Sequence, residues 1–314
     1  MSPVVAGLIL LAAVLHLAWN VLLKTAGDPL RAAWIGMLAG AVVMVPAGVV
    51  GWLLIGRPAV PLQAVGLAAL SGLIEAVYFV LLSAAYRRGD LSVVYPIARG
   101  TAPVLAVAAG VFLLGETLGR EGALGVAAVL AGLFVLQRPW VAFRRLRSSA
   151  AGGASDGTRF ALAAGVTIAL YSAVDRVGVR LVEPWLYAAM LWLFMTSSVN
   201  VFVFTMDHFA PGGLGGEGTP GDAAGRYRRL LSGVNVRRAA VGGLLTLAAY
   251  LLVLIALSLA PLAIVAPLRE SAIVLASGWG VVRLGEAAGW RAATERIGAA
   301  AIVLVGAFLL ALDR

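Results

Sequence analysis

The sequence predicts an all-α integral membrane protein whose ten transmembrane helices form two five-helix inverted repeats (5+5). Of its 314 residues, 61% are hydrophobic and only 12% are charged, whereas a soluble domain carries roughly 25% charged residues. Apolar runs of about 20 residues, the length that a helix needs to cross the hydrocarbon core, recur from end to end. The second half of the chain also resembles the first. These features exclude a water-soluble enzyme.

Five candidate spans lie in the first part of the chain, as judged with a window of about 19 residues. They cover residues 3–23, 31–54, 63–86, 92–114 and 121–137. The first span has no basic segment before it and carries His16 and Trp19, so we expect a retained span rather than a cleaved signal peptide. Residues 1–137 form the first predicted repeat.

Five more candidate spans belong to the second predicted repeat, residues 160–314. They cover residues 160–181, 185–205, 239–258, 261–284 and 294–312. The stretch 138–159 between the repeats is basic and rich in Gly and Ser, which is typical of a linker. A second long stretch, 206–238, is rich in Gly and charge and is expected to be a solvent-facing loop.

The two halves match at proline and charged positions as well as at apolar ones, and such internal similarity decides the fold. With an offset of 155 residues, the matches include Leu15 with Leu170, Ala18 with Ala173 and Pro29 with Pro184. With offsets of 171 and then 170 residues, they include Gly72 with Gly243, Pro96 with Pro267, Arg99 with Arg269, and Leu114-Gly115-Glu116 with Leu284-Gly285-Glu286. Because each repeat holds an odd number of spans, the second repeat must insert upside down relative to the first.

Over nearly its whole length, the chain resembles the ten-helix, EamA-type branch of the drug/metabolite transporter superfamily. The segments that carry the resemblance are HLAWNVLLK from His16, AYRRGDLSVVYPIARGTAP from Ala85, ALSLAPLAIVAPLRESAIV from Ala256, and the two Leu-Gly-Glu triplets. The resemblance implies a secondary transporter that works by alternating access, with the substrate in a central cavity lined by both halves. It does not indicate the substrate, because relatives handle amino acids, sugar phosphates, nucleotide sugars and drugs.

Arg99 and Arg269 lie deep in the fourth and ninth spans, about eight residues or 12 Å from where each span starts. An ionised side chain at a helix centre costs about 2.5–3.5 kcal/mol on insertion scales, so such residues usually face a cavity or a partner. The inverted repeats predict the two arginines at opposite ends of one central cavity. Their guanidinium groups suit a carboxylate or phosphate. They either bind an anionic or zwitterionic substrate or each pair with an internal acid, for which Glu270 is available.

Glu75 lies near the bilayer centre, about twelve residues into the third span. Its counterpart in the second repeat is Thr246, so no symmetric structural role is evident. Burial favours the neutral form of a carboxylic acid. We therefore interpret Glu75 as a candidate substrate-binding and proton-carrying residue, or alternatively as the partner of one of the two arginines. Tyr78 follows on the same helix face as a further substrate-binding candidate, and Glu270 is the second proton candidate.

His16 and Asn20 share one face of the first span, and Tyr171 and Asp175 occupy the matching places in the sixth. Repeated polar stripes of this kind indicate either cavity walls or interhelical hydrogen bonds, which average about 0.6 kcal/mol per pair in membranes. We count His16 and Tyr171 among the candidate substrate-binding residues. Trp19, near the end of its span, is typical of an interfacial anchor.

Two further matched pairs accompany the arginines. Pro96 and Pro267 precede them, and because a mid-helix proline frees a carbonyl and permits a kink, the pair predicts two hinges. Glu116 and Glu286 close the same two spans in the Leu-Gly-Glu triplets. We expect them at membrane exits, where Glu116 meets Arg120, in a structural or gate-latching role.

The sequence argues against a cofactor, a metal and enzymatic activity. It contains no Cys and two His, which leaves no Cys-based site and no spaced partner ligand for His16. It also lacks a nucleotide-binding G-x-x-x-x-G-K-[ST], an H-E-x-x-H and a convincing Ser/His/Asp set. The basic residues that give the net charge of +9 lie mostly between the apolar runs. This position indicates contact with anionic lipid headgroups rather than with nucleic acid.

The orientation of the chain stays open. If both termini lie on one side of the membrane, the loops of the other side hold seventeen basic residues and the terminal side holds five. The positive-inside rule then places the termini outside the cytoplasm. The family resemblance implies termini inside.

The sequence therefore predicts a multi-pass secondary transporter of the plasma (inner) membrane. Its substrate is expected to be a small polar metabolite, anionic or zwitterionic, such as an amino acid or an organic or phospho acid. Ten spans with an internal repeat can form a complete transporter, so a monomer needs no partner chain. The alternatives are an exporter of hydrophobic or cationic compounds and, less favoured, a membrane-embedded enzyme, for which no catalytic cluster is found.

Overall fold

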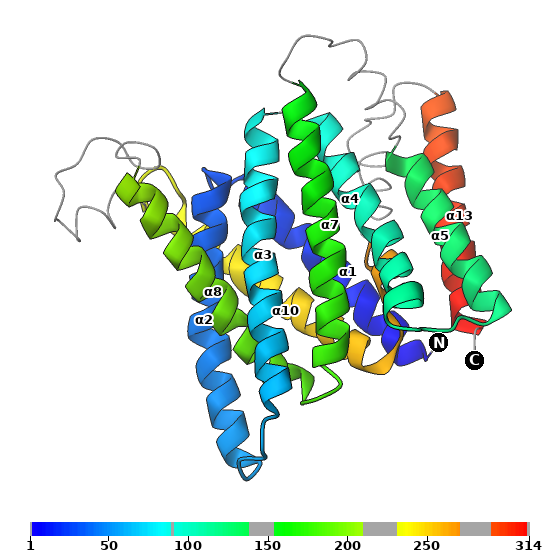
Figure 1. The fold of residues 1–314 in the computed structure, drawn as a ribbon. Coiled ribbons are helices and arrows are strands. Elements are labelled where there is room, and N and C mark those ends of the chain that lie inside the picture. The colour runs from blue at the N-terminus through cyan, green and yellow to red at the C-terminus, as the bar shows by residue number, and fades with distance from the viewer. Residues whose placement is uncertain (1, 89–90, 138–153, 210–230, 271–289, 313–314) are drawn as a thin grey trace.

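The computed structural model describes residues 2–88, 91–137, 154–209, 231–270 and 290–312 (Figure 1). All regular elements within these residues are helical, which confirms the predicted all-α class. The helices of the first half begin and end close to the expected boundaries, and the fourth continues into a π-helical turn. They are α1 (Pro3–Lys24), α2 (Pro29–Leu54), α3 (Leu62–Arg88), α4 (Leu91–Ala108), η1 (Ala109–Leu113) and α5 (Arg120–Gln137).

The second half contributes five more described helices. They are α7 (Ala154–Gly178), α8 (Pro184–Phe209), α10 (Val236–Leu259), α11 (Leu262–Arg269) and α13 (Trp290–Leu312). Helix α7 starts inside the predicted linker and α8 ends inside the predicted loop, because a helix continues past its apolar span where its end turns reach water. The linker residues 138–153, the loop residues 210–230 and the rest of the ninth predicted span lie outside the described residues, as does Glu286.

Two helices that enter the bundle from the same end have matching caps. Asp28 accepts a hydrogen bond from the backbone N–H of Arg31 (3.0 Å) at the start of α2, and Asn235 accepts one from the N–H of Arg238 (3.0 Å) at the start of α10. Both side chains satisfy a first-turn donor that the helix itself leaves unpaired. The N–H of Asn235 also donates to the carbonyl of Ala26 (2.7 Å), which ties the two entry points together.

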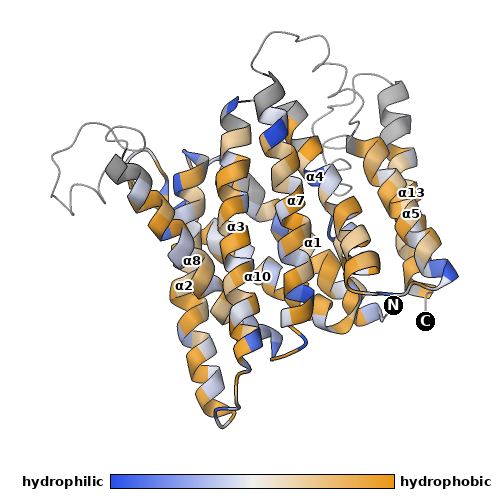
Figure 2. Ribbon diagram, viewed as in Figure 1, coloured by the Kyte–Doolittle hydropathy of each residue, from blue (hydrophilic) through white to orange (hydrophobic). Residues whose placement is uncertain are grey.

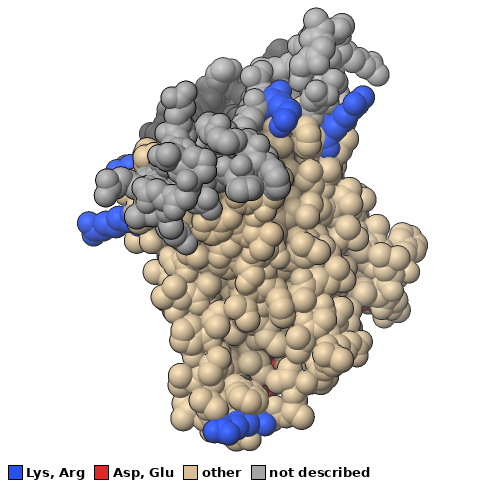
Figure 3. Space-filling model, turned by 60° about the vertical axis from the view of Figure 1, so that its left-hand side comes forward, with Lys and Arg blue, Asp and Glu red and all other residues tan. Residues whose placement is uncertain are grey.

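The surface of the molecule fits a lipid bilayer. Hydrophobic residues make up most of the helix lengths (Figure 2), and on the face shown in Figure 3 a broad band without exposed Lys or Arg separates two ends that carry them. Among the described residues, five helical segments are long and apolar enough to cross a membrane: Leu30–Leu54, Leu62–Ala85, Gly157–Gly178, Pro184–Thr205 and Val236–Leu259. Shorter apolar segments are Pro3–Trp19, Ile97–Leu113 and Ile297–Leu310. The protein is an integral, multi-pass membrane protein.

The two halves of the chain interleave instead of standing side by side. The most extensive helix contacts all join one helix from each half: α3 with α7 and α8, α1 and α2 with α10, α2 with α8, α4 with α7, and α5 with α13. The start of α1 and the end of α13 lie at the same end of the bundle (Figure 1). The core is therefore shared between the halves, and neither half buries its apolar surface alone.

Glycines permit the closest of these contacts. A Cβ atom at Gly243 of α10 would lie 2.1 Å from the carbonyl oxygen of Gly36 in α2, and one at Gly72 of α3 would lie 2.6 Å from the backbone nitrogen of Met195 in α8. Gly72 and Gly243 are the pair that matches between the two halves of the sequence. Helix packing in membranes uses such small residues to bring backbones together.

Gly243→Ala is expected to destabilise the fold, whereas Gly242→Ala on the same helix is not. The new Cβ at position 243 forces α2 and α10 apart, and overpacking of this kind costs about 1–3 kcal/mol. A Cβ at Gly242 meets Leu22 at an ordinary 3.6 Å, and Ala favours a helix more than Gly does. Thermal unfolding of both variants in one detergent measures the difference. Equal melting temperatures would contradict this account of the contact.

Candidate functional site

A central cavity lies where helices of both halves meet. Its empty space, including the opening, is about 770 Å³, within the range of small-molecule sites. Six of the seven predicted substrate-binding residues line it: His16, Glu75, Tyr78, Arg99, Tyr171 and Arg269. The cavity also reaches Ala32 and Ala239, near the starts of α2 and α10. It therefore extends toward the end of the bundle that lies opposite the chain termini.

The two buried arginines meet at one carboxylate. The Nε atom of Arg99 lies 3.2 Å from Oε2 of Glu270, and the Nε atom of Arg269 lies 3.5 Å from Oε1. The Glu270 side chain is fully buried, and both arginines are at least nine-tenths buried. The expectation that the arginines occupy opposite ends of the cavity is therefore wrong, because the start of the ninth span, α11, packs against α4 and brings the two guanidinium groups together.

Glu270 differs from the other predicted residues because it does not line the cavity. It lies directly after α11, where its backbone N–H donates to the carbonyl of Pro267 (3.1 Å). The two arginines thus provide two positive charges against one negative charge, and both line the cavity wall.

Glu75 is the acidic group of the cavity wall. Its side chain is 5% exposed, and its Oε1 atom has no hydrogen-bond partner among the described residues. The salt bridges of the arginines in the described part go to Glu270, so the alternative in which Glu75 pairs with one of them is not what the structure has. A buried carboxylate oxygen without a partner is costly, and here it is positioned to receive a proton or a cationic ligand group.

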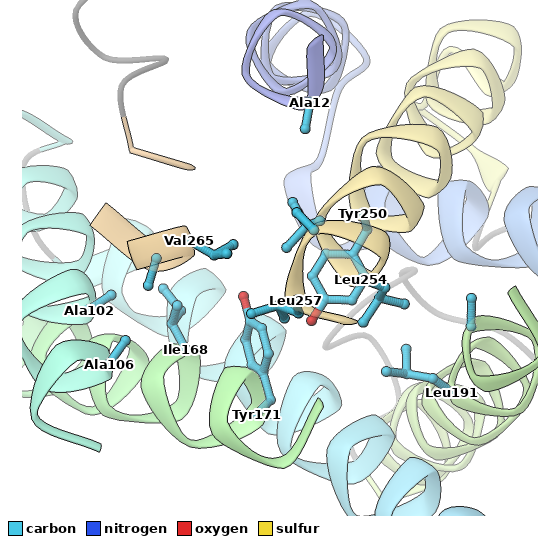
Figure 4. Close-up of a cluster of buried hydrophobic side chains, with 14 of the residues drawn as sticks. Ala12, Ala102, Ala106, Ile168, Tyr171, Leu191, Tyr250, Leu254, Leu257 and Val265 are labelled. Atoms are coloured by element: carbon cyan, nitrogen blue, oxygen red, sulfur yellow. The ribbon is translucent and has the colours of Figure 1, made fainter. Parts of the chain in front are cut away.

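Aromatic rings form most of the remaining wall. Tyr171 contacts Tyr78 and Tyr250 edge to face, with ring centroids 6.1 Å apart in each case, and Trp192 lies 6.0 Å from Tyr250. Tyr171 and Tyr250 project from α7 and α10 into the space between the helices (Figure 4). Trp19 is 8% exposed and also lines the cavity. Its interpretation as an interfacial anchor is therefore wrong.

Asp175 is the most connected polar residue of the described core. Its carboxylate accepts hydrogen bonds from the hydroxyls of Ser71 on α3, Tyr187 on α8 and Tyr250 on α10. The residue is fully buried and lies one helical turn beyond Tyr171. Four helices, α3 of the first half and α7, α8 and α10 of the second, thus converge on one carboxylate beside the cavity.

A polar contact closes the bundle near the chain termini. Gly115 adopts a positive φ of 66°, and the chain after η1 turns back so that Glu116 reaches α11. Its carboxylate accepts hydrogen bonds from the N–H groups of Leu262 (2.8 Å) and Ala263 (3.0 Å) and forms a salt bridge with Arg176 (2.9 Å). An acid at a helix N-terminus satisfies unpaired donors and the helix dipole.

The partner of Glu116 differs from the one expected from the sequence. Glu116 pairs with Arg176 of the other half and not with Arg120, because the turn at Gly115 directs the carboxylate across the bundle. The arrangement joins η1, α7 and α11 at the closed end. We call Glu116, Arg176 and the first turn of α11 the terminal-side latch.

The two prolines differ in their surroundings. Pro267 is buried in the last turn of α11, and the helix ends two residues later at Arg269. Pro96 lies within α4, which continues without a break to Ala108, and the side chain of Pro96 is outside the described part. The structure thus has a helix end beside one proline and an unbroken helix at the other.

Comparison with known proteins agrees with this fold. Residues 4–138 match the EamA-like transporter family. A solved structure described as "Crystal structure of protein" aligns with 99% of this chain and 98% of its own, with a TM-score of 0.64 and 20% sequence identity, which shows a shared fold. No curated protein matches the chain.

A helical membrane protein with a charged cavity between two interleaved halves has the architecture of a small-molecule transporter. Residues 4–138, somewhat less than half of the chain, are thus similar to the EamA-like transporters, which are membrane transporters of the drug/metabolite transporter type.

Sequence reasoning found most charged residues of the cavity and missed part of its wall. Asp175 had a visible signal, because an acid inside an apolar span matched Asn20 of the first repeat. Tyr250 and Trp192 had a weaker one, since aromatic residues in apolar spans are common. Tyr250 does, however, match Phe79 at the offset of 171 residues, and both line the cavity.

Glu270→Gln is expected to destabilise the protein strongly, whereas Glu270→Asp is expected to retain much of the stability. Without the carboxylate, two neighbouring buried guanidinium groups lose their shared counter-charge, and breaking a buried ion pair costs about 3–5 kcal/mol. Adding Arg269→Gln to Glu270→Gln is expected to restore part of the loss. Unfolding curves of the wild type, Glu270→Gln, Arg269→Gln and the double variant measure this cycle. Additive effects of the two substitutions would contradict the shared contact.

Proposed function

We propose that this protein is a secondary active transporter of the plasma (inner) membrane that moves a small polar metabolite by alternating access. The substrate is anionic or zwitterionic, such as an amino acid or an organic or phospho acid. The observation that carries the proposal is the arrangement of charge around the cavity. Arg99 and Arg269 line the cavity and share Glu270, and Glu75 presents a carboxylate oxygen that has no hydrogen-bond partner among the described residues.

This arrangement favours a zwitterion among the predicted substrate classes. A substrate carboxylate can bind to the arginine pair through the fork of guanidinium donors. A substrate ammonium group can balance Glu75 and stack against the aromatic wall through cation–π contact. The tyrosine and tryptophan rings suit the uncharged body of the same molecule.

The proposal includes an architecture of ten spans in two inverted repeats, 1–137 and 160–314, joined by the linker 138–159. Its support is that lining residues of the cavity occur in matched pairs at the offsets found in the sequence. These pairs are His16 with Tyr171, Met37 with Trp192, Glu75 with Thr246, Phe79 with Tyr250, and Arg99 with Arg269. The helix contacts follow the same correspondence between the repeats. Helix α3 contacts α7, and their counterparts α10 and α1 also contact one another. A cavity lined symmetrically by both repeats is suited to opening on either side.

A second candidate function is the export of hydrophobic or cationic compounds. The observation that favours it is the aromatic wall together with Glu75, because aromatic rings and a carboxylate suit an organic cation. In that case Glu270 neutralises the arginines and they do not touch the substrate.

A thermal-shift screen of the purified protein separates the two functions. Amino acids, organic acids, phosphates, phosphonates and cationic drugs are tested as ligands, because a ligand that binds the folded state raises its apparent stability. We expect an anionic or zwitterionic ligand to stabilise the wild type, and to do so at least tenfold less potently in Arg99→Ala and Arg269→Ala. Arg180→Ala, which changes an exposed arginine, is the control and is expected to respond like the wild type.

The charge-retaining variants Arg99→Lys and Arg269→Lys cover the case in which the alanine variants do not fold. They are expected to fold and to bind the ligand more weakly, because an ammonium group cannot reproduce the bidentate contact. Stabilisation by a cationic compound alone, unchanged in the arginine variants, would overturn the proposed substrate class and favour the exporter.

A further inference from the structure

The buried charges of the described residues do not balance. Three acids, Glu75, Asp175 and Glu270, are buried with two arginines, Arg99 and Arg269. Glu116 and Arg176 neutralise one another in the latch and leave this sum unchanged. An uncompensated charge in a low-dielectric interior is expensive and is commonly removed by taking up a proton. One proton on one of the three acids makes the buried set neutral.

Glu270 is held between two guanidinium groups and already has cations as its partners. Glu75 and Asp175 remain. The carboxylate of Glu75 borders the cavity with an oxygen that has no partner in the described part of the chain. Asp175 is fully buried, does not line the cavity, and has hydroxyl groups rather than cations as its hydrogen-bond partners.

Tyr250 connects the two acids. It lines the cavity, as Glu75 does, and its hydroxyl donates to Asp175. A phenol has a single proton to donate, so Tyr250 can donate to only one carboxylate at a time. A proton arriving at Glu75 can therefore reach Asp175 by passing the hydroxyl proton of Tyr250 onward.

We propose that Asp175 is a second proton-binding residue of this transporter, which exchanges one proton with Glu75 through the hydroxyl of Tyr250. In the transfer, the Glu75 carboxylic acid gives its proton to the Tyr250 oxygen while Tyr250 gives its own proton to Asp175. Glu75 becomes a carboxylate, Asp175 becomes a carboxylic acid, and Tyr250 is again a neutral phenol. The role of this proton in transport rests on the proposed function, but its binding does not.

The surroundings of Asp175 define what the proton responds to. The groups that face it are Glu75 and Ser71 from α3, Tyr187 from α8, Tyr250 from α10, and the charge of Arg269 from α11. Tyr171 precedes it by one turn on its own helix. Arg269 is also a proposed substrate contact, so a bound substrate anion that screens this charge favours protonation of Asp175.

Asp175 lies toward the end of the bundle that holds the chain termini. Helix α7 ends three residues later at Gly178, near the chain termini, and the next residue, Arg176, belongs to the terminal-side latch. A proton on Asp175 is therefore separated from the open end by the cavity and from the other end by the latch. This is the position that a transported proton needs between the two states of alternating access.

Infrared titration of the purified protein in lipid nanodiscs tests proton binding without any substrate. The signal is the C=O stretching band of a protonated carboxyl group in an apolar site, followed from mildly acidic to mildly alkaline pH. We expect the wild type to show one such band that appears and disappears reversibly. Glu75→Gln and Asp175→Asn are each expected to shift or abolish it, because the two acids share one proton. Glu121→Gln, at an exposed acid, is expected to leave it unchanged.

Two tyrosine variants keep every carboxylate and so remain informative where Asp175→Asn does not fold. Tyr250→Phe and Tyr187→Phe each remove one hydroxyl donor from Asp175, but Tyr250 alone of the two lines the cavity. Tyr250→Phe is expected to change the pH-dependent band far more than Tyr187→Phe. Wild-type spectra without such a band, or equal spectra for both tyrosine variants and the wild type, would overturn the proposal.

A transport assay then separates failure of this inference from failure of the proposed function. In proteoliposomes with a substrate from the thermal-shift screen, a pH gradient is expected to drive accumulation at least tenfold in the wild type. Asp175→Asn is expected to abolish accumulation and to retain substrate exchange. Accumulation that persists in Asp175→Asn would overturn the coupling role. A wild type that exchanges no substrate while its infrared band titrates would overturn only the proposed function.

Discussion

The contact of one buried carboxylate with two buried guanidinium groups organises the centre of this membrane protein. Glu270 has no access to water, and both Arg99 and Arg269 place their Nε atoms against it. Removing charges from water is costly unless they are closely paired, so α4 and α11 must keep their relative position while the charges remain. The pairing still leaves the arginines at the cavity wall. The same interaction therefore stabilises the centre of the bundle and holds two guanidinium groups at the cavity wall, where a substrate anion can contact them.

The remainder of the site follows from how the two halves interleave. Close backbone contacts at Gly36 with Gly243 and at Gly72 with α8 bring helices of opposite halves together on both sides of the cavity. Toward the chain termini, Glu116 caps α11 and binds Arg176, so the first half closes the second at that end. Breaking the latch costs a few hydrogen bonds and one ion pair. The cavity thus reaches toward the starts of α2 and α10, and the latch holds the opposite end of the bundle together through a small number of polar contacts.

The sequence was sufficient for the helical class, most helix boundaries and the charged residues of the cavity, because hydropathy and charge act locally along the chain. It also pointed to Asp175 through the match with Asn20. It could not predict that Arg99 and Arg269 meet at Glu270, since that contact depends on how α4 and α11 cross. The partner of Glu116 was missed for the same reason, because the turn at Gly115 directs the side chain to the other half. The placement of Trp19 in the cavity wall depends on the position of α1 against α10.

The central claim, that one cavity opens alternately to the two sides, can be tested through the absence of Cys from the chain. Single cysteines at Ala33, in the open part of the cavity, and at Ala260, buried beside the latch, are treated with a membrane-impermeant thiol reagent from either side. The account predicts that Ala33→Cys reacts from one side and is protected by substrate. Ala260→Cys is expected to react only from the opposite side, and only during turnover or after Glu116→Ala. An Ala260→Cys protein that never reacts during turnover, or that reacts from the same side as Ala33→Cys, would contradict alternating access through this cavity.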